Sequence, residues 1–214
     1  MILRGDGAAF SAGLDFASVG KNPARLALAF AKIPGQKTNL FQRACWAWRS
    51  LPVPVIAVLH GRCYGGGLQL ALAADFRFST PDCELSVLEA KWGLIPDMTG
   101  SVTLRELVGM DLAKRLTMTG EMFDGRRAHE WGLVSGVSEH PLTDAEELAA
   151  RIATRSPDSV AATKKLFQNT WHRSPRAAFA VETLLQLRLL TGRNHTIARK
   201  AGTAGPTPEF GPRR

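Results

Sequence analysis

Three consecutive glycines, Gly65 to Gly67, stand between an apolar segment and a segment rich in alanine and leucine. Glycines at the start of a helix allow consecutive backbone N–H groups to face a developing negative charge. A second turn of small residues, Ser11–Asp15, can supply another donor. One donor from each turn would form an oxyanion hole, where a single donor contributes about 3–4 kcal/mol to transition-state stabilisation. A tight turn with close helix–strand packing is the structural alternative for the glycine run.

Histidine and cysteine side chains are weaker candidates for chemistry. His60 precedes the glycine run, but no serine or aspartate stands at a triad spacing from it, so we interpret it as structural. The cysteines at positions 45, 63 and 83 form no CxxC or Cys/His spacing and indicate no metal site. Cys63 lies closest to the glycines, and as a small apolar residue it is more typical of a core than of a nucleophile.

The composition indicates a globular protein with one sizeable core. The chain has 214 residues, of which 45% are hydrophobic, and its mean hydropathy is −0.06. No apolar run approaches the roughly 18 residues that would cross a bilayer, and the N-terminus lacks the pattern of a secretory signal. An odd number of cysteines without such a signal predicts reduced thiols and a cytoplasmic location.

The charge is concentrated near the C-terminus. Residues 1–150 contain 15 Lys and Arg against 16 Asp and Glu, whereas residues 151–214 contain 12 against 3. The second stretch therefore accounts for the whole net charge of +8. A basic region of this kind can meet an anionic ligand, an acidic partner or nucleic acid, or it can be a solvated helical face with a basic tail.

The apolar pattern predicts the elements that would hold the two turns in place. A continuously apolar run is typical of a strand buried on both faces, and spacings of three and four residues predict amphipathic helices. Beyond Glu146 the pattern is mostly helical, and the composition of 201–214 predicts a disordered tail. The expected strands are 53–59, 76–79 and 85–88, and the expected helices are 38–51, 68–74, 100–108 and 111–117.

Three segments together resemble the signatures of the enoyl-CoA hydratase/isomerase (crotonase) superfamily. They are Phe10–Asp15 (FSAGLD), His60–Asp75 (HGRCYGGGLQLALAAD) and Glu89–Asp97 (EAKWGLIPD), in matching order and separation. The resemblance continues through Gly109 to Val134 and covers nearly the whole chain up to the basic tail. It implies an α/β fold, a spiral of strand–strand–helix turns over 1–140, with a helical region over 141–200 that mediates trimer formation. Members normally begin with one further strand–strand–helix unit, which we expect this chain to lack.

The resemblance also implies a reaction class. Members act on coenzyme A thioesters, with CoA as part of the substrate and no separate cofactor, and they form homotrimers or hexamers. Carried over by position, the two oxyanion-hole amides are those of Leu14 and Gly66. Substrate contacts fall, in the same way, on Ser11, Ala12, Asp15, Gly65 and Trp92.

The acid–base groups decide which reaction the site performs. Hydratases of the family carry two glutamates, and the first of these positions is Gln69, which cannot exchange a proton at neutral pH. The second position matches Glu89, and a buried carboxylate with a raised pKa suits proton removal and return. One carboxylate suits a 1,3-proton shift that moves a double bond, although Gln69 could still hold a water for hydration.

Two aspartates near these segments have different expected roles. Asp97 lies eight residues after Glu89, a spacing that resembles the dienoyl-CoA isomerase subgroup. That subgroup has an aspartate at the position of Gln69, and Asp97 also precedes a predicted helix, where it could be the N-cap. Asp75, at a helix-to-strand junction, is interpreted as structural.

Three function classes remain in view from the sequence. The leading one is an acyl-CoA isomerase or hydratase in which Glu89 acts as base and acid. The second is a catalytically weak acyl-CoA-binding or scaffold protein. The third, RNA binding through the basic C-terminal region, is less favoured because no RRM or KH signature is present.

Overall fold

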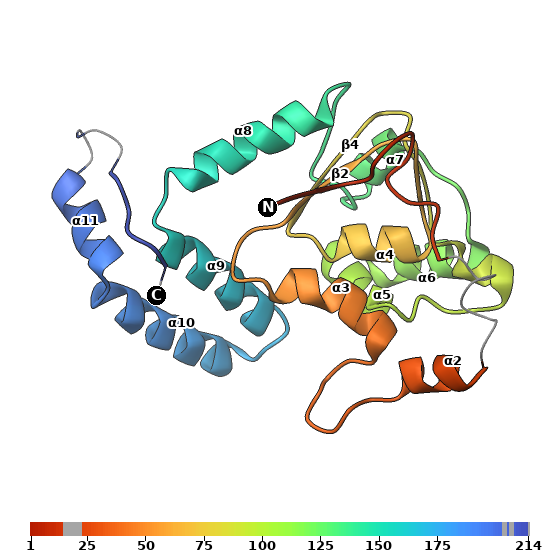
Figure 1. The fold of residues 1–214 in the computed structure, drawn as a ribbon, viewed down its shortest axis with the longest axis horizontal. Coiled ribbons are helices and arrows are strands. Elements are labelled where there is room, and N and C mark those ends of the chain that lie inside the picture. Colours follow the sequence, from red (N-terminus) through yellow and green to blue (C-terminus); the bar gives the residue numbers. More distant parts are fainter. Residues whose placement is uncertain (15–22, 203–204, 206–207, 214) are drawn as a thin grey trace. The chain divides into compact units, whose positions relative to one another are not determined.

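The computed structural model describes residues 1–14, 23–202, 205 and 208–213 (Figure 1). The chain divides into two compact units. The core unit comprises the described residues of Ile2–Leu51 and Val55–Ala145, and the helical unit comprises Met1, Pro52–Pro54 and the described residues of Glu146–Arg214. The fold is an α/β fold with parallel sheets and C-terminal helices, as predicted.

Two parallel sheets form the centre of the core unit. The larger sheet has the strand order β1-β2-β4-β6, with bounds Ile2–Arg4, Ile56–Leu59, Phe76–Ser79 and Gly136–Val137. The smaller sheet pairs β3 (Arg62–Tyr64) with β5 (Glu84–Ser86). Single-residue bridges extend the smaller sheet on both sides, from Ser11 to Cys63 and from Leu85 to Phe123.

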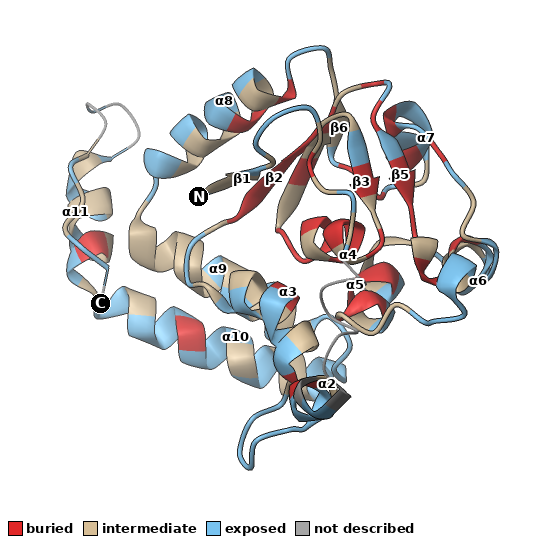
Figure 2. Cartoon of the chain, turned by 45° about the vertical axis from the view of Figure 1, so that its right-hand side comes forward, coloured by how far each residue is buried: buried red, intermediate tan, exposed pale blue. Residues whose placement is uncertain are grey.

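The chain alternates between these sheets and so forms a spiral. After β2 in the larger sheet and β3 in the smaller one comes α4 (Gly66–Leu72), and the next turn repeats the order with β4 and β5. The short 3-10 helix η1 (Leu88–Trp92) follows β5. Parallel strands need a crossover between them, so each turn of the spiral returns the chain to the end of the sheet at which the previous strand began. Figure 2 shows the buried residues concentrated on β2, β5 and α4.

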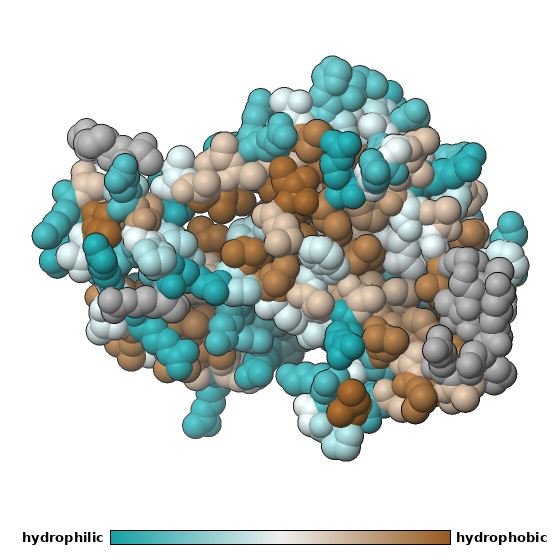
Figure 3. Space-filling view, in the orientation of Figure 1, coloured by the Kyte–Doolittle hydropathy of each residue, from teal (hydrophilic) through white to brown (hydrophobic). Residues whose placement is uncertain are grey.

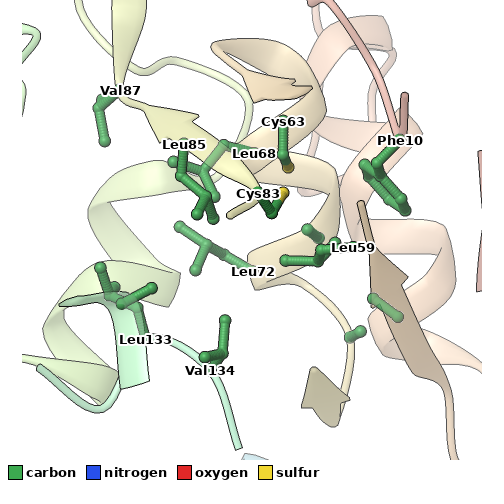
Figure 4. Packing of buried hydrophobic residues seen from close by; sticks show 14 of the residues in the cluster. Phe10, Leu59, Cys63, Leu68, Leu72, Cys83, Leu85, Val87, Leu133 and Val134 are labelled. Carbon is green, nitrogen blue, oxygen red and sulfur yellow. The ribbon is translucent and has the colours of Figure 1, made fainter. Parts of the chain in front are cut away.

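The hydrophobic core of this unit lies between the spiral turns. β2 is buried at all four positions, as expected for a parallel strand covered on both faces. Figure 4 shows the side chains of α4 meeting those of both sheets. Full burial of one such side chain contributes about 1.5–3 kcal/mol to stability. The residues labelled there are Phe10, Leu59, Cys63, Leu68, Leu72, Cys83, Leu85, Val87, Leu133 and Val134.

The helix predicted over 38–51 is confirmed as α3 (Leu40–Ser50). Asn39 caps it: its side chain accepts the Gln42 N–H at 2.8 Å, and Gln42 accepts the Asn39 N–H in return at 3.1 Å. The helix ends at the residue before Leu51, ahead of Pro52. This cap fixes the start of the helix that carries the buried Cys45.

The strand predicted over 53–59 is shorter than expected, because the ladder begins only at Ile56. Pro54 has no N–H to give, and the Val55 N–H donates instead to the Asp75 carboxylate at 2.7 Å. The Val55 carbonyl accepts the N–H groups of Asp75 and Phe76. Asp75 therefore joins the end of one segment to the start of the next, which confirms its structural role.

Other boundaries differ from the predictions by a few residues. The strand predicted over 85–88 is Glu84–Ser86, because Val87 leaves strand geometry and η1 begins at Leu88. The helix predicted over 68–74 begins earlier, at Gly66, so the glycines belong to its first turn. The strand predicted over 76–79 is confirmed. The remaining helices of the core unit are α2 (Pro23–Phe30), α5 (Gly100–Leu107), α6 (Met110–Thr119) and α7 (Gly125–Glu130).

Apolar side chains also reach the surface of the core unit. Leu28 and Phe30 of α2 are 73% and 49% exposed, and Ile33 in the following loop is 58% exposed. Figure 3 shows hydrophobic side chains at the surface over α2 and the loop after it. Isolated exposed apolar residues are common on protein surfaces and by themselves indicate no function.

The helical unit is built from the end of α8 (Pro141–Ala153), α9 (Pro157–Thr170), α10 (Pro175–Leu190) and α11 (Arg193–Ala201). The helices predicted beyond Glu146 are therefore present, whereas a domain boundary at 140/141 remains a proposal. We expected no fixed structure in 201–214, but Gly211 exchanges two hydrogen bonds with the Asn194 side chain, at 2.9 and 3.2 Å. Within the described residues, no helix is long and apolar enough to cross a membrane.

Candidate active site

The two small-residue turns lie side by side in the core unit. The Ser11 N–H donates to the Arg62 carbonyl, and the Ser11 carbonyl accepts the Tyr64 N–H, both at 3.0 Å. A Cβ at position 67 would lie 2.5 Å from the Ser11 Cβ, so only glycine allows this approach. A Cβ at Gly13 would likewise lie 3.2 Å from the Tyr64 carbonyl oxygen. The fold thus brings Ser11–Leu14 against the glycine run.

Helix α4 opens directly at this contact. Gly66 is its first residue, and the first N–H groups of a helix have no carbonyl partner within it. Gly66 is half-buried, and the Met98 side chain covers it, since a Cβ there would lie 2.9 Å from the Met98 Sδ. Leu14 is 36% exposed, one residue beyond the glycine that packs on Tyr64.

Glu89 and Gln69 meet in the interior beside these turns. Glu89 lies on η1 and Gln69 on α4, and they are 7% and 2% exposed. The Gln69 Nε2 donates to the Glu89 Oε1 at 2.6 Å. The same carboxylate faces Gly65, where a Cβ would lie 3.6 Å from the Glu89 Oε1. Two residues that are 20 positions apart in the sequence therefore form one buried polar pair.

The surroundings favour the protonated form of Glu89. Burial raises its pKa above the ordinary value, because an ionised carboxylate loses hydration there. Its own backbone N–H and the Gln69 amide act in the opposite direction, while the negative charge of Asp97 adds to the increase in pKa. The Glu89 Oε2 is buried without a hydrogen-bond partner among the described residues. An ionisable oxygen that makes no hydrogen bond with the described residues is thus shielded from water.

The loop before α5 contributes two further hydrogen bonds to the Glu89–Gln69 pair, and the sequence did not predict them. The Gln69 Oε1 accepts the N–H groups of Met98 and Gly100, at 2.8 and 2.9 Å. Thr99 between them is buried and has a positive φ of 85°, which is uncommon for a residue with a side chain. Backbone donors leave no signature in residue types, so the sequence offered no signal for these contacts.

Asp97 lies on the same loop but does not cap the helix. The N-cap of α5 is Thr99, and no side chain makes a capping hydrogen bond there. The alternative of an N-cap role for Asp97 is therefore wrong. Asp97 is half-buried and acts on Glu89 through its charge.

The remaining predicted substrate contacts lie at the surface or outside the described residues. Trp92 at the end of η1 is 56% exposed, with the Lys91 ammonium 5.9 Å from its ring centre. Ala12 is exposed beside Ser11. Asp15 falls outside the described residues.

The other candidate nucleophiles and ligands have structural roles. Cys63 is fully buried, and burial raises the pKa of its thiol well above the ordinary value. The His60 Nε2 lies 3.0 Å from the Gly7 carbonyl oxygen, where it ties two loops together. Cys45 is also fully buried, with a pKa raised by burial to about 12. Over the described part of the chain, no group of three His, Cys, Asp or Glu side chains could hold a metal ion.

Replacing Gly65 by alanine should destabilise the core unit by about 2 kcal/mol. Gly65 has φ +50° and ψ −121°, a combination that residues with a Cβ rarely adopt, and such strain typically costs 1–3 kcal/mol. The new Cβ would meet Glu89 at an ordinary contact distance, so backbone strain is the cause.

Urea unfolding measures the loss of stability in Gly65→Ala. Gly93→Ala is the control, because Gly93 is left-handed in open space and should lose only about 1 kcal/mol. Equal losses in both variants would contradict this explanation.

The chain is similar to known proteins over most of its length. The family model for enoyl-CoA hydratase/isomerase matches residues 1–200. The chain is 38% identical over 122 residues to a carnitinyl-CoA dehydratase of Citrobacter koseri, covering 56% of this chain and 47% of that protein. It is 36% identical over 172 residues to a probable enoyl-CoA hydratase of Bacillus subtilis, covering 78% and 63%. The chain thus spans about half the length of the first relative and just under two thirds of the second.

Solved structures show the same fold over nearly the whole chain. An enoyl-CoA hydratase from Bacillus anthracis superposes with a TM-score of 0.88 at 27% identity, covering 98% of this chain and 80% of that one. A putative enoyl-CoA hydratase from Streptomyces coelicolor superposes with a TM-score of 0.86 at 30% identity, covering 98% of this chain and 76% of that one.

Proposed function

This chain belongs to the enoyl-CoA hydratase/isomerase family, and we propose that it moves the double bond of an enoyl-CoA thioester by proton transfer through Glu89. The observation that carries the proposal is the buried Glu89 carboxylate, whose pKa is raised and whose Oε2 has no partner among the described residues. A carboxylate whose pKa is raised accepts a proton more readily than an ordinary glutamate and can return it. Gln69 cannot share that task, because its amide does not ionise.

The proposed reaction has two steps. Glu89 removes a proton from the carbon between the double bond and the thioester carbonyl, which leaves an enolate. The N–H groups of Leu14 and Gly66 would hold the enolate oxygen, since electrostatic stabilisation is strongest where charge develops. Glu89 then returns the proton to the far carbon of the former double bond, so that no proton is gained or lost overall.

Other residues of the two turns would position the substrate. We propose that Ser11, Ala12 and Gly65 line the thioester, and that the exposed indole of Trp92 contacts another part of the acyl-CoA. The same proposal includes Asp15. Asp97 would act on the reaction through the pKa of Glu89. Basic residues of the helical unit are candidates for the CoA phosphates, and a homotrimer or hexamer is the proposed assembly.

Hydration is the second candidate function. The names of the relatives favour it, since they include enoyl-CoA hydratases and a carnitinyl-CoA dehydratase. Water would then add across a 2-enoyl double bond, with Glu89 exchanging the proton. Only one of the two carboxylates that hydratases of the family carry is present here, and this favours the double-bond shift.

An absorbance assay on a panel of 2-enoyl, 3-enoyl and dienoyl-CoA thioesters tests the proposal. A shift from 3-enoyl to 2-enoyl raises the absorbance of the conjugated thioester, whereas hydration of a 2-enoyl substrate lowers it. We expect turnover of the 3-enoyl substrate. Calorimetric binding of acyl-CoA without turnover of any substrate would favour a binding or scaffold protein instead.

The pH dependence of the same assay should follow the ionisation of Glu89. Because the base must be ionised and burial raises its pKa, kcat/KM should fall on the acid side through a pKa above that of an ordinary glutamate. A profile that is flat down to the ordinary carboxyl range would contradict the assignment of Glu89 as the base.

A further inference from the structure

Gln69 is held in one orientation by its contacts. Its Oε1 accepts two backbone N–H groups, from Met98 at 2.8 Å and Gly100 at 2.9 Å. Since only an oxygen can accept both, the two ends of this amide cannot be exchanged. The Nε2 is therefore the atom that faces the Glu89 Oε1, at 2.6 Å. The side chain is 2% exposed, which leaves it no room to turn toward water.

This orientation makes the two oxygens of Glu89 unequal. The Oε1 accepts an N–H from Gln69, and in a protonated carboxyl the carbonyl oxygen is a stronger acceptor than the hydroxyl oxygen, so the short contact favours the Oε1 as the carbonyl oxygen. A proton on Glu89 therefore belongs on the Oε2. That oxygen is buried and makes no hydrogen bond with the described residues.

We infer that Gln69 is a positioning residue, which confines the transferable proton of Glu89 to the Oε2 and fixes that oxygen relative to the loop entering α5. The inference rests on the proposed function, because it assigns the atom through which the proton moves. Gln69 joins Glu89 to Met98 and Gly100, so the carboxylate and this loop form one hydrogen-bonded unit. The Met98 side chain of the same loop covers Gly66.

A glutamate at position 69 would remove this difference between the Oε1 and the Oε2 of Glu89. Its first oxygen could still accept the N–H groups of Met98 and Gly100, so the loop would keep its acceptor. Its second oxygen would face the Glu89 Oε1 at about the present distance, and two carboxylates so close share one proton. The proton would then lie between the two side chains instead of on the Oε2.

The test measures the pKa of Glu89 by ¹³C NMR in the substrate-free protein, for the unchanged chain and for Gln69→Glu. Among the described residues, the other ionisable groups that interact electrostatically with Glu89 are Asp97 on the loop and the Cys45 thiol on α3, and Gln69→Glu keeps both. We expect the pKa of Glu89 to rise by more than about 1 unit in Gln69→Glu, and the acid limb of kcat/KM to move with it. An unchanged pKa of Glu89 in Gln69→Glu would show that the side chain at position 69 does not hold the Glu89 carboxylate at hydrogen-bond distance, and that result would overturn the inference.

Two further measurements keep the inference testable if Gln69→Glu does not fold. In the unchanged chain, one side-chain amide proton of Gln69 should titrate with the pKa of Glu89, and an amide resonance that stays fixed would overturn the inference. The exchange variant Gln69→Glu/Glu89→Gln should be inactive, because the N–H groups of Met98 and Gly100 would hold the carboxylate at position 69. Recovered activity would show that the two positions are interchangeable.

The outcomes separate the inference from the proposed function. If no CoA thioester is turned over but the Gln69 amide proton titrates with Glu89, the proposed function fails and the positioning role stands. If the chain isomerises enoyl-CoA and the pKa of Glu89 is the same with glutamine or glutamate at position 69, the positioning role fails alone.

Discussion

Replacement of Glu89 by glutamine is expected to lower kcat for enoyl-CoA isomerisation by about 10²–10⁴-fold, the range that a positioned acid–base group contributes. Glutamine has nearly the same shape and cannot exchange a proton. Binding of an acyl-CoA, measured by calorimetry, should stay unchanged, so the loss should fall on kcat rather than on KM. Glu84→Gln is the matched control, because Glu84 is an exposed carboxylate on the preceding strand. Full activity of Glu89→Gln would remove this residue from the mechanism.

The stability of Glu89→Gln distinguishes lost chemistry from misfolding. The folded chain holds the pKa of Glu89 above its value in the unfolded chain. Its protonated form therefore supports the fold fully below the unfolded pKa, and this support is lost as the pH rises through the folded pKa. Glutamine never ionises, so the variant should be at least as stable as the unchanged chain at neutral pH. A lower melting temperature at neutral pH would contradict the buried, pKa-raised state of Glu89.

Replacement of Gly66 by proline should lower kcat by about 10²–10³-fold, the loss observed when one oxyanion-hole donor is removed. Proline has no N–H, and the first position of a helix tolerates it well. The proline Cδ clashes with the N–H and the Cβ of the preceding residue, and the second clash is absent here because that residue is Gly65. The fold should therefore survive while the donor is lost.

Gly66→Ala is the matched control for this prediction. Both variants place a Cβ near the Met98 Sδ, at 2.9 Å in the present geometry, and the flexible end of Met98 can move aside in each. Alanine keeps the N–H, so its kcat should stay within about 10-fold of the unchanged chain. Equal losses in the two variants would assign the effect to Met98 and not to the amide.

The sequence predicted the elements of the core unit well wherever apolar patterning decides them. The strand at 76–79 and the helix near 38–51 follow from such patterns, and three ordered motifs indicated the spiral. Predicted boundaries were wrong where a side chain takes the place of a hydrogen-bond partner on the neighbouring strand, as the Asp75 carboxylate does for the Val55 N–H. The start of α4 at Gly66 was missed because glycine is a poor helix former in general.

The candidate site was predictable in its residues but not in its connections. The motif positions indicated Glu89 and Gln69, and the structure brings them to 2.6 Å. Their link to the loop runs through the N–H groups of Met98 and Gly100, which every residue except proline possesses. The roles considered for Asp97 followed from its spacing along the chain. The N-cap of α5 is instead Thr99, whose positive φ sets the direction in which the chain enters the helix.

Exchange of hydrogen for deuterium at the carbon next to the thioester tests the central claim most directly. A saturated acyl-CoA incubated with the chain in D₂O can gain deuterium only if a base removes that proton and an enolate forms, and mass spectrometry detects the gain without any net reaction. We predict deuterium incorporation with the unchanged chain and with Glu84→Gln, and none above the uncatalysed rate with Glu89→Gln. Equal incorporation with Glu89→Gln, or none with the unchanged chain while the acyl-CoA binds, would contradict the claim that Glu89 moves this proton.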